Sequence, residues 1–216
     1  PQASMSESFC PDCTLCPRLA SFLAKAKHQN PDYFCKPVPS FGDPHARLLI
    51  VGLAPGMHGA NRTGRPFTGD HAGILLYASL HAAGLATAPV SKDRFDGLQL
   101  RGARISNAVK CLPPDNKPLP VEIKTCNRYL TAELEELQSV RSILALGTVA
   151  HESVLLALGL KRTFAKFGHA SEHELPGGRR LVDSYHCSRY NTQTRRLTPE
   201  MFRAVLGRAA TLAGLS

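Results

Sequence analysis

Four short, predominantly apolar runs along the chain predict buried β-strands. They cover residues 47–51, 102–108, 142–146 and 180–185. Short runs of this kind are typical of strands that other elements cover on both faces of a sheet.

Helical patterns separate these runs. They extend over residues 17–27, 73–83, 120–137 and 148–158, and a last helix begins with Thr198 as its N-cap and Pro199 in its first turn. The apolar positions of this last helix recur at helical spacing: Met201, Phe202, Val205, Leu206, Ala209 and Leu212. The alternation of strands and helices predicts an α/β fold, a single three-layer α/β/α domain with a short, mostly parallel central sheet.

The segments between these elements do not divide the chain. The proline-rich stretch of residues 29–45 is predicted to be an ordered, irregular connection, not a linker between domains. We therefore expect residues 1–216 to form one domain, with residues 1–9 disordered.

Polar or glycine-rich segments follow all four predicted strands. They are residues 52–56, 107–111, 147–148 and 186–191. Because ligands of open α/β sheets bind beyond the carboxyl ends of the strands, this arrangement predicts one functional site built from all four segments.

The longest of these connections, residues 52–73, holds six glycines in 22 residues. Glycines let the backbone approach a ligand closely and present N–H donors to it. The segment lacks the Gly-Lys-Ser/Thr ending of a nucleotide-binding P-loop and also lacks a dinucleotide fingerprint. Arg62 and Arg65 add positive charge, Phe67 a flat apolar face and Asp70 a carboxylate. A plain surface loop is the alternative, but loops this long in compact domains are usually functional.

The composition is that of a globular protein with an excess of positive charge. Of 216 residues, 43% are hydrophobic and 20% charged, and the net charge is +9. This balance favours a polyanionic partner, above all nucleic acid, over a merely basic surface. No apolar run approaches the roughly 18 residues of a membrane helix, and residues 1–7 lack a signal core. We therefore expect a cytoplasmic, nucleoid-associated protein that is not secreted.

Seven cysteines suggest metal ligation. Cys10, Cys13 and Cys16 crowd together near the N-terminus, and the others are scattered: Cys35, Cys111, Cys126 and Cys187. In a reducing compartment, thiolates at such spacings bind metals more often than they form disulfides. Spacing alone favours zinc over an iron–sulfur cluster, because short paired knuckles are commoner in zinc sites.

Five ordered segments of the chain resemble the signature of the uracil-DNA glycosylase superfamily, specifically its UDGb type, or family 5. They are residues 13–19 (CTLCPRL), residues 37–43 (PVPSFGD), the glycine-rich segment 52–73, residues 107–114 (NAVKCLPP) and residues 186–198 (HCSRYNTQTRRLT). The similarity extends over nearly the whole chain.

The resemblance implies a monofunctional DNA glycosylase that hydrolyses the N-glycosidic bond of uracil in DNA and so starts base excision repair. Hypoxanthine, xanthine and etheno-cytosine are further candidate substrates. Such an enzyme flips the nucleotide out of the stack and stabilises the negative charge that develops on the departing base. No lysine is placed as a Schiff-base nucleophile, so strand cleavage is not expected.

The family's functional residues map onto individual positions of this chain. Phe67 corresponds to the aromatic that stacks on the base, Asn107 to the residue that reads its edge, and His186 to the histidine that faces its carbonyl oxygen. The resemblance places further base-pocket residues in the first loop: Gly52, Ala54, Pro55, Gly56 and His58. Without the resemblance, Asn107 and His186 would be equally consistent with satisfied structural residues.

Asp70 is the catalytic candidate that the resemblance leaves most open. Many branches of the superfamily carry a carboxylate or amide in the first loop, where this chain offers only His58. The UDGb type shares this lack, and Asp70 is the substitute that would orient water and stabilise the sugar cation. Asp70 is equally placed to cap the helix predicted at 73–83. Two departures from the family pattern are Met57, where small residues are usual, and Arg195, where glycine is usual.

The resemblance also reverses the preference for zinc. It implies a [4Fe–4S] cluster held by Cys13, Cys16, Cys111 and Cys126, which ties down the N-terminal segment of the fold. Cys10 rivals Cys13, because Cys10 and Cys13 have the same spacing as Cys13 and Cys16; the anchor of the match, residues 17–19, favours Cys13. Cys35 and Cys187 are expected to stay free.

The basic loop at residues 188–196 is predicted to enter a DNA groove. The expected DNA contacts are Arg62, Arg65, Ser188, Arg189, Asn191 and Arg195. The expected partner is DNA with uracil or other deaminated bases, bound by a monomer. The rival interpretation is a non-enzymatic nucleic-acid-binding module organised by a four-cysteine metal site, which would not need the polar residues at the strand ends.

Overall fold

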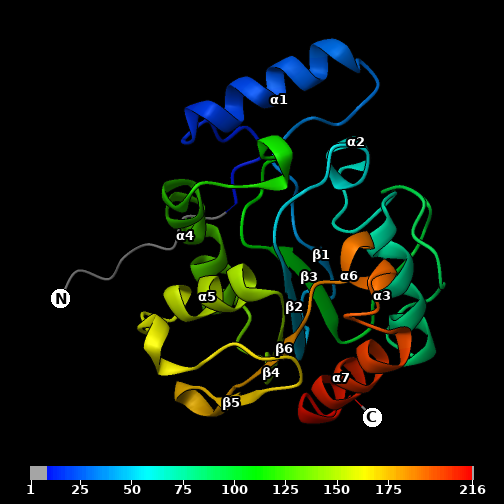
Figure 1. The fold of residues 1–216 in the computed structure, drawn as a ribbon, viewed down its shortest axis with the longest axis vertical. Helices are drawn as coiled ribbons and strands as arrows, with labels where there is room; N and C mark the ends of the chain where they lie inside the picture. Colours follow the sequence, from blue (N-terminus) through cyan, green and yellow to red (C-terminus); the bar gives the residue numbers. More distant parts are fainter. Residues whose placement is uncertain (1–8, 216) are drawn as a thin grey trace.

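The computed structural model describes residues 9–215 and contains a six-stranded mixed sheet (Figure 1). The order is β1–β3–β2–β4–β6–β5. Its strands are β1 (Phe41–Gly42), β2 (Leu48–Gly52), β3 (Ala103–Asn107), β4 (Ser142–Leu146), β5 (Glu172–Glu174) and β6 (Arg180–Ser184). The four predicted strands are the parallel centre, and β1 and β5 add short antiparallel edges. The disorder expected for residues 1–9 lies outside the described residues except at Phe9, whose ring packs edge-on against Tyr129.

Helices cover both faces of the sheet (Figure 1). One face carries α3 (His71–Ala82) and α7 (Pro199–Leu212), and the other carries α4 (Pro120–Glu136) and α5 (Thr148–Ala157). A further helix, α1 (Pro17–Gln29), packs with the segment after β3 and with α4. The α/β fold predicted from the alternation of elements is therefore confirmed.

The strand sequences explain the two layers of core. Successive side chains of a strand point to opposite faces, so Leu48 and Ile50 pack beneath α3 and α7, while Leu49 and Val51 pack beneath α4 and α5. All four are fully buried. A run with no polar position suits a strand that is covered on both sides.

Local capping signals fix where two helices begin. Thr198 accepts a hydrogen bond from the Met201 backbone N–H at 3.2 Å, and Pro199 follows at the first position, as predicted. The Asp70 side chain accepts from the Gly73 N–H at 2.9 Å and caps α3. Both acceptors satisfy amides that the helix itself leaves unpaired.

The strand order places the carboxyl end of β2 at the centre of the molecule's ligand-binding edge. The next parallel strands in the chain, β3 and β4, lie on opposite sides of β2. The connections therefore diverge around β2, and such a switch point leaves a crevice at the carboxyl end of the strands. The glycine-rich segment starts directly from β2, so it borders this crevice.

Candidate active site

A pocket of about 430 Å³ lies at this edge of the sheet and opens into an outer groove of about 740 Å³. Six residues line both spaces: Gly56, Phe67, Asp70, His71, Asn116 and Arg189. Asn107 and His186 line only the inner pocket. The predicted aromatic, amide, imidazole and carboxylate therefore meet in one cavity.

Two glycines allow Phe67 to reach its place. Phe67 adopts a left-handed backbone conformation with φ of 53°, and its side chain is buried. A Cβ on Gly73 would overlap the Phe67 carbonyl oxygen, and a Cβ on Gly52 would lie 2.5 Å from the Phe67 ring. Only glycine fits at either position, which explains part of the glycine content of the segment.

The Phe67 ring stacks beside the imidazole of His186. Their ring centroids are 5.8 Å apart and their planes differ by 29°. His186 follows β6, and Asn191 donates a hydrogen bond from its side-chain amide to the His186 carbonyl at 2.8 Å. Burial lowers the pKa of His186 to about 4, so the ring is neutral near pH 7. A neutral imidazole offers one N–H donor to a ligand.

Asn107 is the last residue of β3, and its side-chain amide oxygen has no hydrogen-bond partner within the described residues. The residue is 3% exposed, and among the described residues its Oδ1 has no hydrogen-bond donor. A buried acceptor without a partner costs about 1–3 kcal/mol, so such atoms usually serve a ligand or a water. In the pocket, Asn107 therefore presents an unused acceptor.

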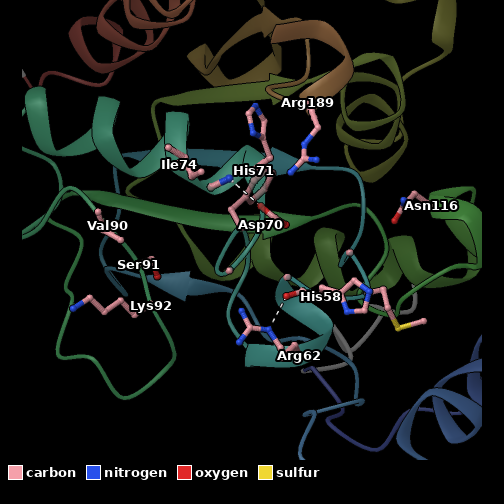
Figure 2. A pocket seen from close by; sticks show the side chains of 16 residues that line it. His58, Arg62, Asp70, His71, Ile74, Val90, Ser91, Lys92, Asn116 and Arg189 are labelled. Atoms are coloured by element: carbon pink, nitrogen blue, oxygen red, sulfur yellow. Dashed lines mark hydrogen bonds between the residues drawn. The ribbon is translucent and has the colours of Figure 1, made fainter. Parts of the chain in front are cut away.

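Asp70 is both a helix cap and a wall of the pocket. Oδ1 accepts from Gly73, while Oδ2 faces the glycine turn at Gly56 and Gly59. Burial raises the pKa of Asp70, and the backbone hydrogen bond from Gly73 opposes this effect. Figure 2 shows Asp70 between Arg189 and His71 on one side and Arg62 and His58 on the other. The capping role is thus confirmed, and the catalytic role stays a prediction.

Only some of the first-loop residues predicted for the base pocket line it. Ala54 and Gly56 line the inner pocket, whereas His58 lies in the outer groove, where its Nδ1 is 2.9 Å from the Tyr33 hydroxyl. Pro55 is buried and lines neither space. The first loop therefore brings backbone and small side chains to the pocket, and its histidine is turned toward Tyr33.

One expected DNA contact needs correction. Arg65 is only 4% exposed; it forms a 2.8 Å ion pair with Asp96, and its guanidinium stacks over the Phe41 ring. A guanidinium that is buried and paired in this way cannot bind a phosphate, so Arg65 is a structural residue.

The remaining DNA candidates surround the mouth of the pocket. Arg62 and Arg189 line the outer groove, and both are exposed (Figure 2). Ser188 caps the short helix α6 (Arg189–Gln193), where the sequence predicted a loop. Arg195 is exposed just beyond this helix with φ of 57°. That conformation favours glycine over arginine.

Two of the six residues that line both spaces were not predicted from the sequence. His71 lines both spaces, and its Nε2 lies 2.9 Å from the Thr192 hydroxyl, which links α3 to α6. Asn116 reaches the pocket from the connection between β3 and α4, with φ of 55°. His71 directly follows Asp70 and could have been suspected, but no pattern signals Asn116.

The four cysteines proposed as ligands converge beyond β3. Cys13, Cys16, Cys111 and Cys126 line one small cavity between α1 and α4, together with apolar side chains. Cys10 is exposed and does not line this cavity. Burial and the neighbouring thiols raise the pKa of Cys16 to about 11 and also raise those of Cys111 and Cys126. Four such thiolates need a bound cation to be stable together.

Comparisons with known proteins agree with this geometry. A model of the uracil DNA glycosylase superfamily matches residues 39–210. The type-5 uracil-DNA glycosylase of Thermus thermophilus is 50% identical over 208 residues, which are 94% of each chain. The corresponding protein of Mycobacterium bovis is 45% identical over 94% of this chain and 79% of its own.

More distant relatives match a smaller part of the chain. A type-4 uracil-DNA glycosylase of Thermotoga maritima is 31% identical over 68% of this chain and 67% of its own. The type-5 relatives are more similar and cover more of the sequence. The chain therefore belongs to the uracil-DNA glycosylase superfamily, in its type-5 group.

Proposed function

We propose that this protein is a uracil-DNA glycosylase that hydrolyses the N-glycosidic bond of uracil in DNA, the step that starts base excision repair. The observation that carries the proposal is the unpartnered Asn107 Oδ1, held in one pocket with Phe67 and the neutral imidazole of His186. The type-5 relatives support the same activity by their names and their similarity along nearly the whole chain.

The pocket suits a flipped base. Phe67 offers an aromatic face for stacking, and the Asn107 amide offers an acceptor to the N3–H of uracil and a donor to its O4. The two groups are adjacent, since a Cβ on Gly52 would touch both. Binding the base thus satisfies the acceptor that is buried without a partner, and part of the cost of unstacking is recovered.

His186 is suited to stabilise the departing base. As the bond between the sugar and uracil breaks, its electron pair moves onto the base and negative charge grows on O2. A neutral imidazole donates its N–H to that oxygen, and the buried setting strengthens the interaction. No proton has to be taken from solvent for this step.

Asp70 is our candidate for the group that stabilises the sugar and positions the attacking water. Asp70 lines the pocket with its Oδ2 beside the glycine turn, and the carboxylate can stabilise the positive charge on the sugar and orient the water that adds to C1′. The bond from C1′ to uracil N1 breaks and uracil leaves with its electrons; the water oxygen bonds to C1′, and the proton that the water loses passes through solvent to the uracil anion. Among the described residues, no lysine lines the inner pocket, which agrees with a monofunctional enzyme.

We also propose that Cys13, Cys16, Cys111 and Cys126 hold a [4Fe–4S] cluster. Zinc–thiolate bonds of about 2.3 Å would bring tetrahedral ligands to about 3.8 Å from one another. In the part of the chain that the structure describes, no three cysteine sulfurs lie within 4.8 Å of one another. A wider group that binds each thiolate at a separate iron fits this spacing better. The cluster would stabilise the packing of α1 and α4 near Asn107.

The proposal includes the binding partner, the oligomeric state, the location and the range of substrate bases. Uracil-containing DNA is the proposed partner of a monomeric, cytoplasmic protein, and hypoxanthine, xanthine and etheno-cytosine are further candidate bases. No helix in residues 9–215 is long and apolar enough to cross a membrane.

The decisive experiment incubates the protein with duplexes that each carry one of these bases or none. Alkali then cleaves abasic sites. We expect alkali to cleave the uracil duplex at the position that held uracil and to leave the undamaged duplex intact. Tight binding to every duplex without any abasic product would instead identify a non-enzymatic DNA-binding protein.

A further inference from the structure

A second cluster of metal-binding side chains lies away from the pocket, on the face of the sheet that α5 covers. His151 of α5, His173 of β5 and Asp183 of β6 bring their ligand atoms within 4.8 Å of one another. His151 Nδ1 lies 2.8 Å from Asp183 Oδ1, and His173 Nε2 lies 3.2 Å from Asp183 Oδ2. The side chains of Asp183 and His151 are buried, and that of His173 is 20% exposed.

The hydrogen bonds of His151 require a proton or a metal ion between its Nδ1 and Asp183. Its Nε2 lies 3.0 Å from the Ala165 carbonyl oxygen, which only accepts, so Nε2 carries a hydrogen. In the neutral ring, Nδ1 then has a lone pair, and this lone pair faces a carboxylate oxygen. Two acceptors at 2.8 Å repel each other unless a cation lies between them. It is either a proton, carried by His151 or by Asp183, or a metal ion.

The third member of the cluster favours the metal. A proton between His151 and Asp183 accounts for one contact only, and His173 Nε2 then needs its own hydrogen to donate to Asp183 Oδ2. His173 brings a further nitrogen to the other carboxylate oxygen, from a different element. Two imidazoles and one carboxylate form a common zinc ligand set, and tetrahedral ligand atoms at about 2.1 Å from zinc are about 3.4 Å apart. The 3.2 Å contact of His173 with Asp183 is close to that spacing, whereas the 2.8 Å contact of His151 with Asp183 is shorter and has to lengthen when the ion binds.

The surroundings have the features of a metal site. Metal-binding histidines usually donate their second N–H to a carbonyl or carboxylate, as His151 does to Ala165. The Gly168 N–H donates to Asp183 Oδ2 at 3.3 Å and holds the carboxylate in place. The partial exposure of His173 leaves a route by which an ion and a water ligand can enter.

We propose that His151 Nδ1, His173 Nε2 and a carboxylate oxygen of Asp183 bind a transition-metal ion, zinc by preference. The ion joins α5, β5 and β6, which lie together in Figure 1. Asp183 also exchanges backbone hydrogen bonds with Ala170 and Ser171, so the ion anchors the loop before β5 as well. Asp183 precedes His186 by three residues, and the site therefore steadies the strand that ends at the catalytic pocket.

The test titrates Zn²⁺ into the intact protein as purified, after dialysis against a mild chelator. We expect one zinc per chain with the iron content unchanged, and a rise in Tm of about 5–10 °C at roughly 100 times Kd. His173→Gln should lose this zinc and the rise, whereas His81→Gln, which changes an exposed histidine of α3, should keep both.

Cobalt identifies the ligands independently of any variant. Co²⁺ bound to the wild-type protein should show visible bands without sulfur charge-transfer absorption, because the three ligand atoms are nitrogen and oxygen. Wild-type protein that binds no zinc would overturn the proposal, and the three side chains would then be a protonated hydrogen-bond network. Zinc retained by a folded His173→Gln variant, or a sulfur-rich cobalt spectrum, would place the ion elsewhere.

Discussion

The side-chain oxygen of Asn107 lies 2.5 Å from the point that a Cβ on Gly52 would occupy. The same Cβ would also touch the Phe67 ring. The close approach of three elements at the carboxyl end of β2 therefore depends on the absence of one methyl group.

Gly52→Ala should consequently damage the pocket. The new methyl group displaces Asn107 or Phe67, and a shift of about 1 Å in such groups costs on the order of 10²-fold in rate. Single-turnover excision from a uracil duplex measures this loss. Gly207→Ala is the matched control, because its Cβ would meet nothing within 4 Å and it lies within α7. Equal rates for the two variants would contradict the crowding at Gly52.

His186→Ala should slow single-turnover excision by roughly 10²–10³-fold with little change in DNA affinity, since the lost N–H acts chiefly in the transition state. Asn107→Ala should instead weaken both binding and discrimination, because the flipped base loses its edge contacts. A variant of His186 that retains the wild-type rate would remove this residue from the mechanism.

The lowered pKa of His186 makes its contribution insensitive to mild acid. The ring is neutral in the folded protein down to about pH 4, so its protonation should not reduce excision between pH 8 and pH 5. In the unfolded chain the ring takes up a proton near pH 6.5. Its contribution to stability is thus complete above that pH and is lost as the pH falls toward 4. Comparing Tm against pH for wild type and His186→Ala measures this difference.

Asp70→Asn separates capping from catalysis. Asparagine caps a helix nearly as well as aspartate, so α3 should remain intact. Burial raises the pKa of Asp70, which means that its charged form is disfavoured in the fold; Tm should therefore stay equal or rise. If the carboxylate stabilises the sugar cation, excision should slow while DNA binding is unchanged. Wild-type excision would assign Asp70 to capping alone.

The arginines should divide into two classes. Arg189→Ala should lower the slope of log affinity against log salt by about one, because an exposed phosphate contact is lost. Arg65→Ala should lower Tm, because Asp96 would lose its ion-pair partner. Binding isotherms over a range of salt and thermal melts distinguish these outcomes. A salt slope that Arg189→Ala leaves unchanged would place the DNA elsewhere.

Anaerobically purified protein should contain about four irons per chain. Cys10 is exposed and lies outside the thiol cavity, so Cys10→Ser should keep the iron, while Cys13→Ser should lose it. Iron analysis and visible absorption measure both. Stoichiometric zinc in place of iron would contradict the cluster and leave the glycosylase proposal untouched.

The spacing of apolar residues and the placement of the motifs predicted most of the fold, because apolar residues mark the positions that are buried. The apolar runs located the strand ends to within one residue: they predicted ends at residues 51 and 108, and the strands end at Gly52 and Asn107. The edge strands β1 and β5 were missed, since two or three residues carry no measurable period. Helix α6 was taken for a loop because its five residues are all polar or exposed.

The site was harder to predict where a residue's role depends on distant partners. Arg65 resembles Arg62 in sequence, and only the ion pair with Asp96, 31 positions away, shows that it is structural. The turn of His58 toward Tyr33 is equally invisible in the local sequence. Chain-distant contacts of this kind follow from the folded arrangement and leave no mark on the spacing of the residues involved.

The contact between His71 and Thr192 ties the residue after Asp70 to the helix that carries Arg189. A displacement of α6 on a DNA backbone would therefore reach the start of α3 through one hydrogen bond. Phosphate binding by α6 and the placement of the Asp70 carboxylate are then coupled through His71. The way α6 sits on the surface thus bears on the residue next to the carboxylate that caps α3 and lines the base pocket.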